Sequence, residues 1–160
     1  MPCYLFTYHA YSSWMPDREE GYVRRGEGLL PADEERARLY RRDAVEQPVV
    51  FDPRIQLLLI DEVRAASPHQ RFRVHYVATE PTHVHALVSW QDDRPWKNMR
   101  SNLKSSLTRR LNRELERRTW LSENASRKQV KHQAHFDYLV NEYLPSHRGR
   151  KWKEGSEPIR

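Results

Sequence analysis

Two histidines, His83 and His85, are separated by a single residue at the start of an apolar run that ends at Trp90. Because the side chains of a β-strand alternate between its two faces, a strand here would point both imidazoles to one side and Val84 to the other. Imidazole nitrogens bind Mn, Zn, Ni, Co and Fe well. The pair therefore predicts part of a divalent metal site, which needs a third ligand from elsewhere in the chain.

Near the C-terminus, Tyr138 and Glu142 lie four residues apart. In an α-helix this spacing places both side chains on one face, one turn apart. A metal held by the two histidines would polarise a phosphate oxygen while the Tyr138 phenolate attacks phosphorus, with Glu142 as the third ligand. A phosphotyrosine formed in this way stores the energy of the broken phosphodiester, so the strand could be rejoined without ATP.

Tyr143 is an alternative nucleophile, because His147 follows it by four residues. Pro145 lies between the two and is expected to end the helix. We therefore favour Tyr138, since a nucleophile requires a regular scaffold. His9 and His75 fall on other predicted strands and could lie close to the site, although core or surface roles are expected for both.

Three predicted strands would position the histidines. Aromatic and β-branched residues predict strands at 4–11, 71–79 and 83–90, and residues 80–82 join the last two as a hairpin. In the second strand, alternation predicts one face formed by Phe72, Val74, Tyr76 and Ala78, and an opposite face formed by Arg73, His75 and Val77.

Helices account for most of the remaining chain. Asp52 and Pro53 predict a helix start, and Ser67–Pro68 predicts its end. A second helix runs from Trp96 to about Arg118, with a leucine-rich stripe at every fourth residue. A short edge strand at 127–130 and a last helix at 134–144 complete the order strand–helix–strand–strand–helix–strand. This order predicts an α+β, ferredoxin-like antiparallel sheet with helices on one face.

The 160 residues predict one domain, 1–160, with an irregular insert at about 14–50 and a basic tail of low order at about 146–160. The insert includes a short exposed helix predicted at 31–42. A single cysteine, Cys3, excludes a disulfide framework, and no apolar run approaches the ~18 residues of a membrane span. With no signal peptide pattern, we expect a cytoplasmic protein that does not associate with membranes.

Basic residues point to a nucleic-acid partner. The net charge is +6, and the predicted helix 96–118 carries eight Lys and Arg residues against two Glu. Such side chains bind phosphates without reading sequence, and tryptophans can stack on unpaired bases. The residues expected to contact DNA are Lys97, Arg100, Lys104, Arg109, Arg110, Arg127, Lys128, Arg148, Arg150 and Trp152.

The histidine segment 80–88 resembles the proline-x-His-hydrophobic-His strand of the single-tyrosine HUH transposases, and 136–142 is similar to their terminal Tyr-x-x-x-Gln helix. That family includes insertion-sequence transposases and REP-associated tyrosine transposases. Glu142 replaces the common glutamine, and Thr82 stands where asparagine or aspartate is common. The resemblance, which covers nearly the whole chain in element order, implies the HUH endonuclease fold, with His83, His85 and Glu142 binding Mg or Mn and Tyr138 as nucleophile.

The resemblance also implies the reaction, which is cleavage and rejoining of single-stranded, hairpin-bearing DNA through a 5′-phosphotyrosine. Related transposases are often dimers, so a homodimer is one expected form of assembly. Two alternatives remain open at this stage. One is a non-catalytic DNA hairpin-binding protein derived from such a transposase, and the other is a metal-dependent RNA- or DNA-binding module without covalent chemistry.

Overall fold

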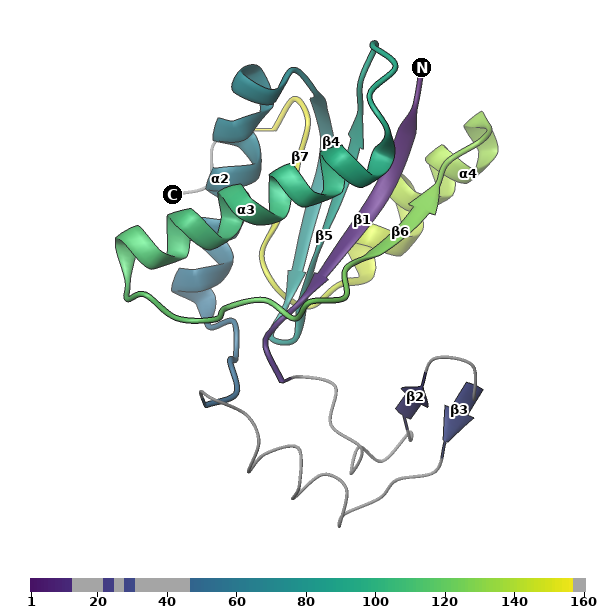
Figure 1. Ribbon diagram of the computed structural model, residues 1–160. Helices are drawn as coiled ribbons and strands as arrows, with labels where there is room; N and C mark the ends of the chain where they lie inside the picture. The colour runs from purple at the N-terminus through teal and green to yellow at the C-terminus, as the bar shows by residue number, and fades with distance from the viewer. Residues whose placement is uncertain (13–21, 25–27, 31–46, 157–160) are drawn as a thin grey trace.

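A five-stranded antiparallel sheet organises the chain, which the computed structural model describes for residues 1–12, 22–24, 28–30 and 47–156 (Figure 1). The strand order is β6-β1-β5-β4-β7. These strands span Ser126–Gln129 (β6), Cys3–His9 (β1), His83–Ser89 (β5), Arg73–Glu80 (β4) and Lys151–Lys153 (β7). The predicted α+β, ferredoxin-like class is confirmed, because the elements follow the expected order: β1, helix α2 (Pro53–Gln70), β4, β5, helix α3 (Trp96–Glu114) and β6.

The helices lie on both sides of this sheet. The long helices α2 (Pro53–Gln70) and α3 (Trp96–Glu114) cover one face, and the short α4 (Gln133–Tyr138) with the turns after it covers the other (Figure 1). Alternate residues of β5 face the two helical layers: Val84 and Val88 pack beneath α2 and α3, whereas Leu87 packs against the C-terminal segment. The one-sided arrangement expected from sequence therefore holds for the two long helices only.

The long helices begin as predicted and end differently. The Asp52 carboxylate caps α2 by accepting a 2.8 Å hydrogen bond from the Ile55 N–H. The helix continues through Pro68, which lies in its last turn, and ends where Arg71 adopts a left-handed conformation with φ 54°. Helix α3 buries the expected leucine-rich stripe, but it ends at Glu114, before the predicted end near Arg118. After the helix the chain turns back, and the Trp120 indole N–H donates a hydrogen bond to the Asn112 side chain.

A β-bulge changes the predicted faces of β4. Val74 pairs with Val88 and Tyr76 pairs with Leu87, so His75 is the additional residue. The bulge turns Val77 to the same core as Val74, and it leaves Tyr76 and Ala78 on the opposite face. The strict alternation expected over this strand is therefore wrong beyond Val74, because a bulge inserts one residue and reverses the faces that follow.

Parts of the predicted insert and of the predicted tail form strands. Much of the insert, including the helix predicted at 31–42, lies outside the described residues, which show a small sheet of β2 (Tyr22–Arg24) and β3 (Gly28–Leu30). The C-terminal residues 151–153, expected in a tail of low order, form β7 and pair with β4. None of the helices among the described residues has the length and hydropathy of a membrane span.

A buried polar network attaches the C-terminal segment to the sheet. The Gln56 side-chain oxygen accepts a hydrogen bond from the Arg150 N–H at 3.0 Å and lies 2.9 Å from the Thr79 hydroxyl. The Thr79 N–H donates to the Arg150 carbonyl at 3.0 Å. At Gly149 a Cβ atom would lie 2.1 Å from the Thr79 carbonyl oxygen. Only glycine allows the backbone to approach β4 this closely.

We expect Gly149→Ala to lower the free energy of unfolding by about 1–3 kcal/mol, because the added methyl group forces the segment away from Thr79. Urea denaturation measures the change. Arg148→Ala, at the neighbouring exposed residue, is the matched control and should change stability by less than about 0.5 kcal/mol. A Gly149→Ala protein as stable as the wild type would contradict the close approach.

Candidate metal and tyrosine site

Three histidine rings converge where β5 begins. His83 and His85 project from one face of β5, and His147 reaches them from the segment that follows the C-terminal helical turns. One ligand atom from each of the three residues lies within 4.8 Å of the others. The ring centroids of His85 and His147 are 4.6 Å apart, and those of His83 and His85 are 4.7 Å apart. This is the only group among the described residues with the geometry to hold a metal ion.

Hydrogen bonds orient each ring through Nδ1. The Thr7 hydroxyl lies 2.6 Å from His85 Nδ1, and the Thr82 hydroxyl lies 3.0 Å from His83 Nδ1. His147 Nδ1 is 3.1 Å from the carbonyl oxygens of both Tyr143 and Leu144. Because carbonyl oxygens only accept, Nδ1 of His147 carries its proton. In all three rings Nε2 is thus the nitrogen that a metal would use, oriented as metal-binding histidines usually are.

The donor set fits a divalent transition metal. Burial, followed by the nearby charges of His83, His147 and His9, lowers the pKa of His85 to about 3. His85 is therefore neutral at physiological pH, and the neutral imidazole is the form that binds metal. Three imidazoles suit Mn, Co, Ni, Zn or Fe, whereas Mg prefers oxygen ligands.

A π-helical turn brings both candidate tyrosines to this site. Helix α4 ends at Tyr138 and is followed by a π-helical turn, Leu139–Tyr143, and a 3₁₀ turn, Leu144–Ser146. Backbone hydrogen bonds in a π-helix join residues five apart, and here the rings of Tyr138 and Tyr143 stack at a centroid distance of 6.3 Å. The Tyr143 hydroxyl lies 3.5 Å from His85 Nε2. Both tyrosines thus share the face that leads to the histidines.

The two tyrosines differ in accessibility. Tyr138 is 50% exposed, so a bound strand can reach its hydroxyl. Tyr143 is half-buried, and desolvation, with a smaller effect of Tyr138, raises its pKa. Of the two, Tyr143 contacts the histidine cluster through its hydroxyl, and Tyr138 is the more accessible to solvent.

His147 was noted in the sequence but was not expected to reach the site. Pro145 was expected to separate it from Tyr143, yet their rings lie 5.0 Å apart. Pro145 lies at the start of the 3₁₀ turn, where the backbone N–H would have no helical partner, so proline is tolerated there. The chain therefore stays helical to Ser146. Glu142 is exposed on the π-helical turn and does not belong to the histidine group. Its role as a ligand stays a prediction.

The two other histidines considered in the sequence occupy different places. His9 pairs with His83 across β1 and β5, and their ring centroids are 6.0 Å apart. His9 therefore borders the cluster and contributes to the low pKa of His85. His75 lies near the opposite end of β5, where its Nε2 is 2.7 Å from the Ser89 hydroxyl.

Some of the predicted DNA-binding residues gather around Trp96 at the start of α3. The cationic groups of Lys97, Arg100 and Arg127 lie 5.7, 5.0 and 4.2 Å from the centre of its ring. Lys128 follows Arg127 on β6 and is exposed. Trp96, Lys97, Arg100 and Arg127 join α3 to the edge strand β6, and we call these four residues the Trp96 patch.

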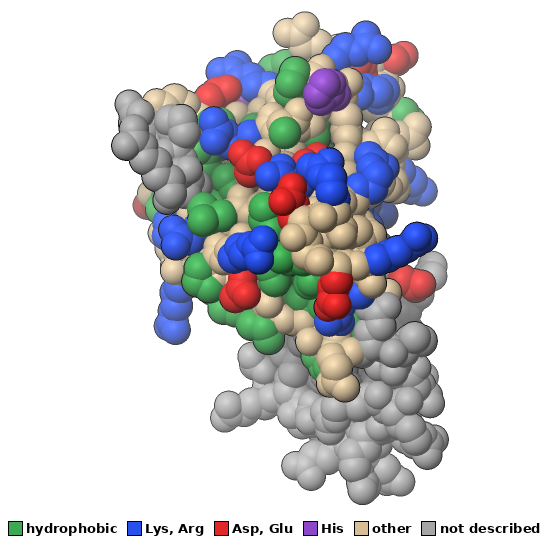
Figure 2. Space-filling model, turned by 90° about the vertical axis from the view of Figure 1, so that its left-hand side faces the viewer, with side chains coloured by type: hydrophobic (Ala, Val, Ile, Leu, Met, Phe, Trp, Pro, Cys, Tyr) green, Lys and Arg blue, Asp and Glu red, His purple; other side chains and the backbone are tan. Residues whose placement is uncertain are grey.

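Other predicted DNA-binding residues have partners within the fold. Arg110 contacts the carboxylates of Asp61, Glu62 and Glu114, which neutralise its charge. On the side of the molecule that carries α2, Figure 2 shows Lys and Arg side chains mixed with acidic and hydrophobic ones. The remaining placements are Lys104 donating to the Glu123 carbonyl, Arg109 beside Ser106, Arg148 and Arg150 exposed before β7, and Trp152 half-buried on β7 beneath Arg64.

The metal-free protein should lose stability as the pH falls from about 6.5 towards 3. Unfolded His85 takes up a proton near pH 6.5, whereas folded His85 does so only near pH 3, so protons favour the unfolded state between these values. Denaturation curves across this range, compared between wild type and His85→Asn, isolate the effect. His69→Asn, at an exposed position of α2, is the control. Parallel curves for wild type and His85→Asn would contradict the expectation.

Two solved structures have a fold similar to that of this chain. No protein-family model matches the chain, and no curated protein does. A REP-associated tyrosine transposase bound to a REP hairpin shares 8% identity over 89% of this chain, with a TM-score of 0.51, and this chain spans 64% of its length. A transposase candidate from Deinococcus radiodurans R1 shares 11% identity over 94% of each chain, with a TM-score of 0.52. The likeness supports the resemblance to single-tyrosine transposases, and the chain has the fold of these proteins.

Proposed function

We propose that this protein cleaves and rejoins single-stranded DNA through a tyrosine nucleophile, at a divalent metal site formed by His83, His85 and His147. The observation that carries the proposal is the convergence of three oriented imidazoles with two tyrosines on one helical face. A protein that only binds DNA needs neither feature. The shared fold with a tyrosine transposase bound to a hairpin supports DNA as the substrate.

In this reaction the Tyr138 oxygen attacks a phosphorus atom of the strand as its own proton is lost. The bond from phosphorus to the 3′ oxygen breaks, and that oxygen leaves with a proton as a 3′-hydroxyl, so a 5′-phosphotyrosine is formed. Rejoining reverses these steps with a 3′-hydroxyl as the attacking group. A bound metal would supply Lewis-acid polarisation of the phosphate. Tyr143, against His85 Nε2, closes the inner side of the site.

The DNA strand would be held by charge outside the site. The Trp96 patch presents cations that no carboxylate among the described residues neutralises by an ion pair. Arg148 lies one residue after His147, so the metal site has a cation beside it. Contacts of this kind bind single-stranded or hairpin DNA through phosphates, which makes the affinity dependent on salt.

His147→Ala should weaken binding of Mn or Co by at least ~10-fold, because it removes one of three nitrogen ligands. Titration calorimetry of the metal-free protein measures the affinity. Glu142→Ala, on the turn before, is the matched comparison, because the sequence predicted Glu142 as the third ligand; if His147 is that ligand, Glu142→Ala should leave the affinity unchanged. Equal loss in both variants would make both residues ligands, and loss only in Glu142→Ala would favour Glu142 over His147.

Tyr138→Phe should abolish a covalent protein–DNA adduct, because it removes the attacking oxygen and leaves the ring in place. The wild type is incubated with labelled single-stranded hairpin DNA and Mn, and the adduct is detected on a denaturing gel. Tyr143→Phe should retain the adduct, at a lower rate if its hydroxyl orders the site. The reverse pattern would make Tyr143 the nucleophile. Binding without any adduct in the wild type would favour the alternative of a non-catalytic hairpin-binding protein.

A further inference from the structure

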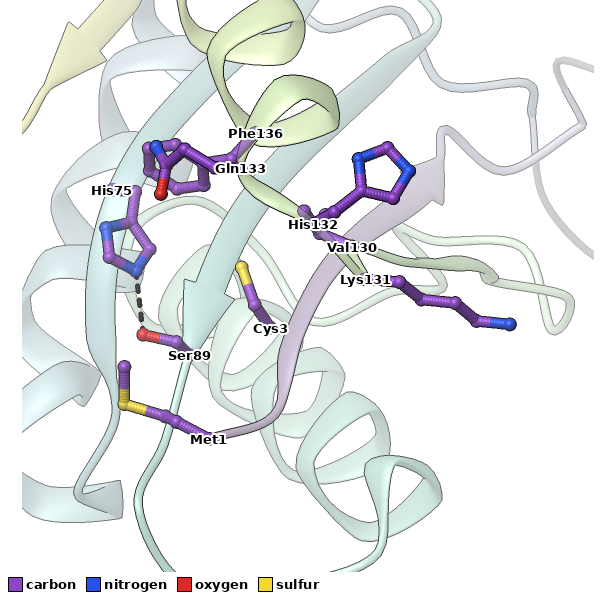
Figure 3. Close-up of a pocket in the computed structure, with 9 residues that line it drawn as sticks. All are labelled: Met1, Cys3, His75, Ser89, Val130, Lys131, His132, Gln133 and Phe136. Atoms are coloured by element: carbon purple, nitrogen blue, oxygen red, sulfur yellow. Dashed lines mark hydrogen bonds between the residues drawn. The ribbon is translucent and has the colours of Figure 1, made fainter.

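A second cavity, separate from the histidine cluster, opens on the same face of the sheet at the other end of β5. It has a volume of about 300 Å³. Cys3, His75 and Ser89 contribute from three neighbouring strands, and Phe136 and Gln133 cover it from α4. Figure 3 shows the His75 ring, the Ser89 hydroxyl and the Cys3 sulfur around the same space, whereas Lys131 points outward. Neither the metal site nor the two tyrosines uses these groups.

The walls combine a flat apolar surface with a polar floor. The Phe136 and His75 rings lie perpendicular to each other at a centroid distance of 5.1 Å, and Val130 adds a second apolar wall. Ser89 is buried and its hydroxyl lies 2.7 Å from His75 Nε2, so the pair keeps further donor and acceptor capacity for a ligand. A planar heterocycle with polar edges matches these walls, since an aromatic ring can stack and its edge can form hydrogen bonds.

Positive charge at the opening of the cavity would attract a ligand that carries phosphate groups. Lys131 lies on the rim, and Lys128 is exposed on the adjacent strand β6. Two acidic groups lie nearby and both have partners within the protein. Asp137 accepts from the Gln133 amide at 2.8 Å, and Glu154 pairs with Arg73 and lies 3.9 Å from His75 Nδ1. The cavity and the histidine cluster lie on the same face of the sheet, because His85 and Ser89 are four residues, or roughly 13 Å, apart on β5.

We propose that this cavity receives one unpaired base of the same DNA strand whose phosphate reaches the histidine site. The inference rests on the proposed function, since it takes single-stranded DNA as the substrate. It adds a base-holding site that fixes the strand at a set distance from Tyr138. The base would stack on Phe136, its edge would meet Ser89, His75 and Gln133, and its phosphates would lie towards Lys131 and Lys128.

Cys3 provides a direct test, because it is the only cysteine of the chain and lines the cavity. Burial raises the pKa of its thiol to about 11, so labelling is slow and its rate is measurable. The wild type, kept metal-free with EDTA to prevent cleavage, is treated with N-ethylmaleimide with and without saturating single-stranded DNA. We expect DNA to slow the labelling of Cys3 by at least ~5-fold, the effect of one stacked base. An unchanged rate would overturn the proposal.

An abasic scan distinguishes an inserted base from DNA that merely covers the opening. Oligonucleotides that lack one base at each position in turn should all protect Cys3 except the one missing the inserted base. Phe136→Leu, which keeps apolar packing and removes the aromatic face, should also lose protection. Lys97→Ala, on α3 at the Trp96 patch, is the control that lowers affinity and keeps full protection at saturation. Protection that is independent of every base, or that a free deoxynucleotide gives equally well, would overturn the proposal.

The covalent adduct and the protection of Cys3 are measured independently. Protection without an adduct would leave the base site intact and overturn the cleavage function. An adduct formed without protection would leave the cleavage function intact and overturn the base site.

Discussion

The two faces of β5 are the constraint on which both the core and the site depend. This strand is central in the sheet, and it is paired on both sides by antiparallel neighbours. Its even-numbered apolar residues enter the core beneath the long helices, whereas His83, His85, Leu87 and Ser89 face the shorter C-terminal segment. A slip of one residue would bury the imidazoles beneath α2 and α3 and expose valines. The strand pairing that forms the core therefore also brings His83 and His85 to the same face as the C-terminal segment.

Strong periodic patterns made most of this architecture predictable from sequence. The His-x-His strand, the capped start at Asp52 and the leucine stripe of α3 are local signals, and each is confirmed by the structure. The bulge at His75 was not predictable, because two-residue alternation contains no signal for an additional residue. Strand β7 was also missed, since Lys151–Lys153 is short and basic and becomes a strand only through its pairing with β4.

The candidate site was predictable in its residue types and less so in its geometry. The rule that residues four apart share a helical face holds for an α-helix, and it paired Tyr138 with Glu142. The π-helical turn is wider than an α-helical one, because its hydrogen bonds join residues five apart; here the Tyr138 ring stacks on Tyr143, and Glu142 is exposed. No local sequence pattern predicts this π-helical turn. It is stabilised by tertiary packing, because Leu139 and Leu144 are both buried against the sheet.

The edge strand β6 places positive charge on both faces of the sheet, because Arg127 and Lys128 are consecutive and their side chains point to opposite faces. Arg127 pairs opposite Phe6, whose side chain enters the core beneath the long helices, and it lies over Trp96 on that side. Lys128 pairs opposite Leu5, whose side chain packs on the opposite face, together with the C-terminal segment. Charged residues on an edge strand discourage pairing with another chain. The same two residues place positive charge on both faces of the sheet at this edge, on one side beside the Trp96 patch and on the other side on the face that holds the histidines.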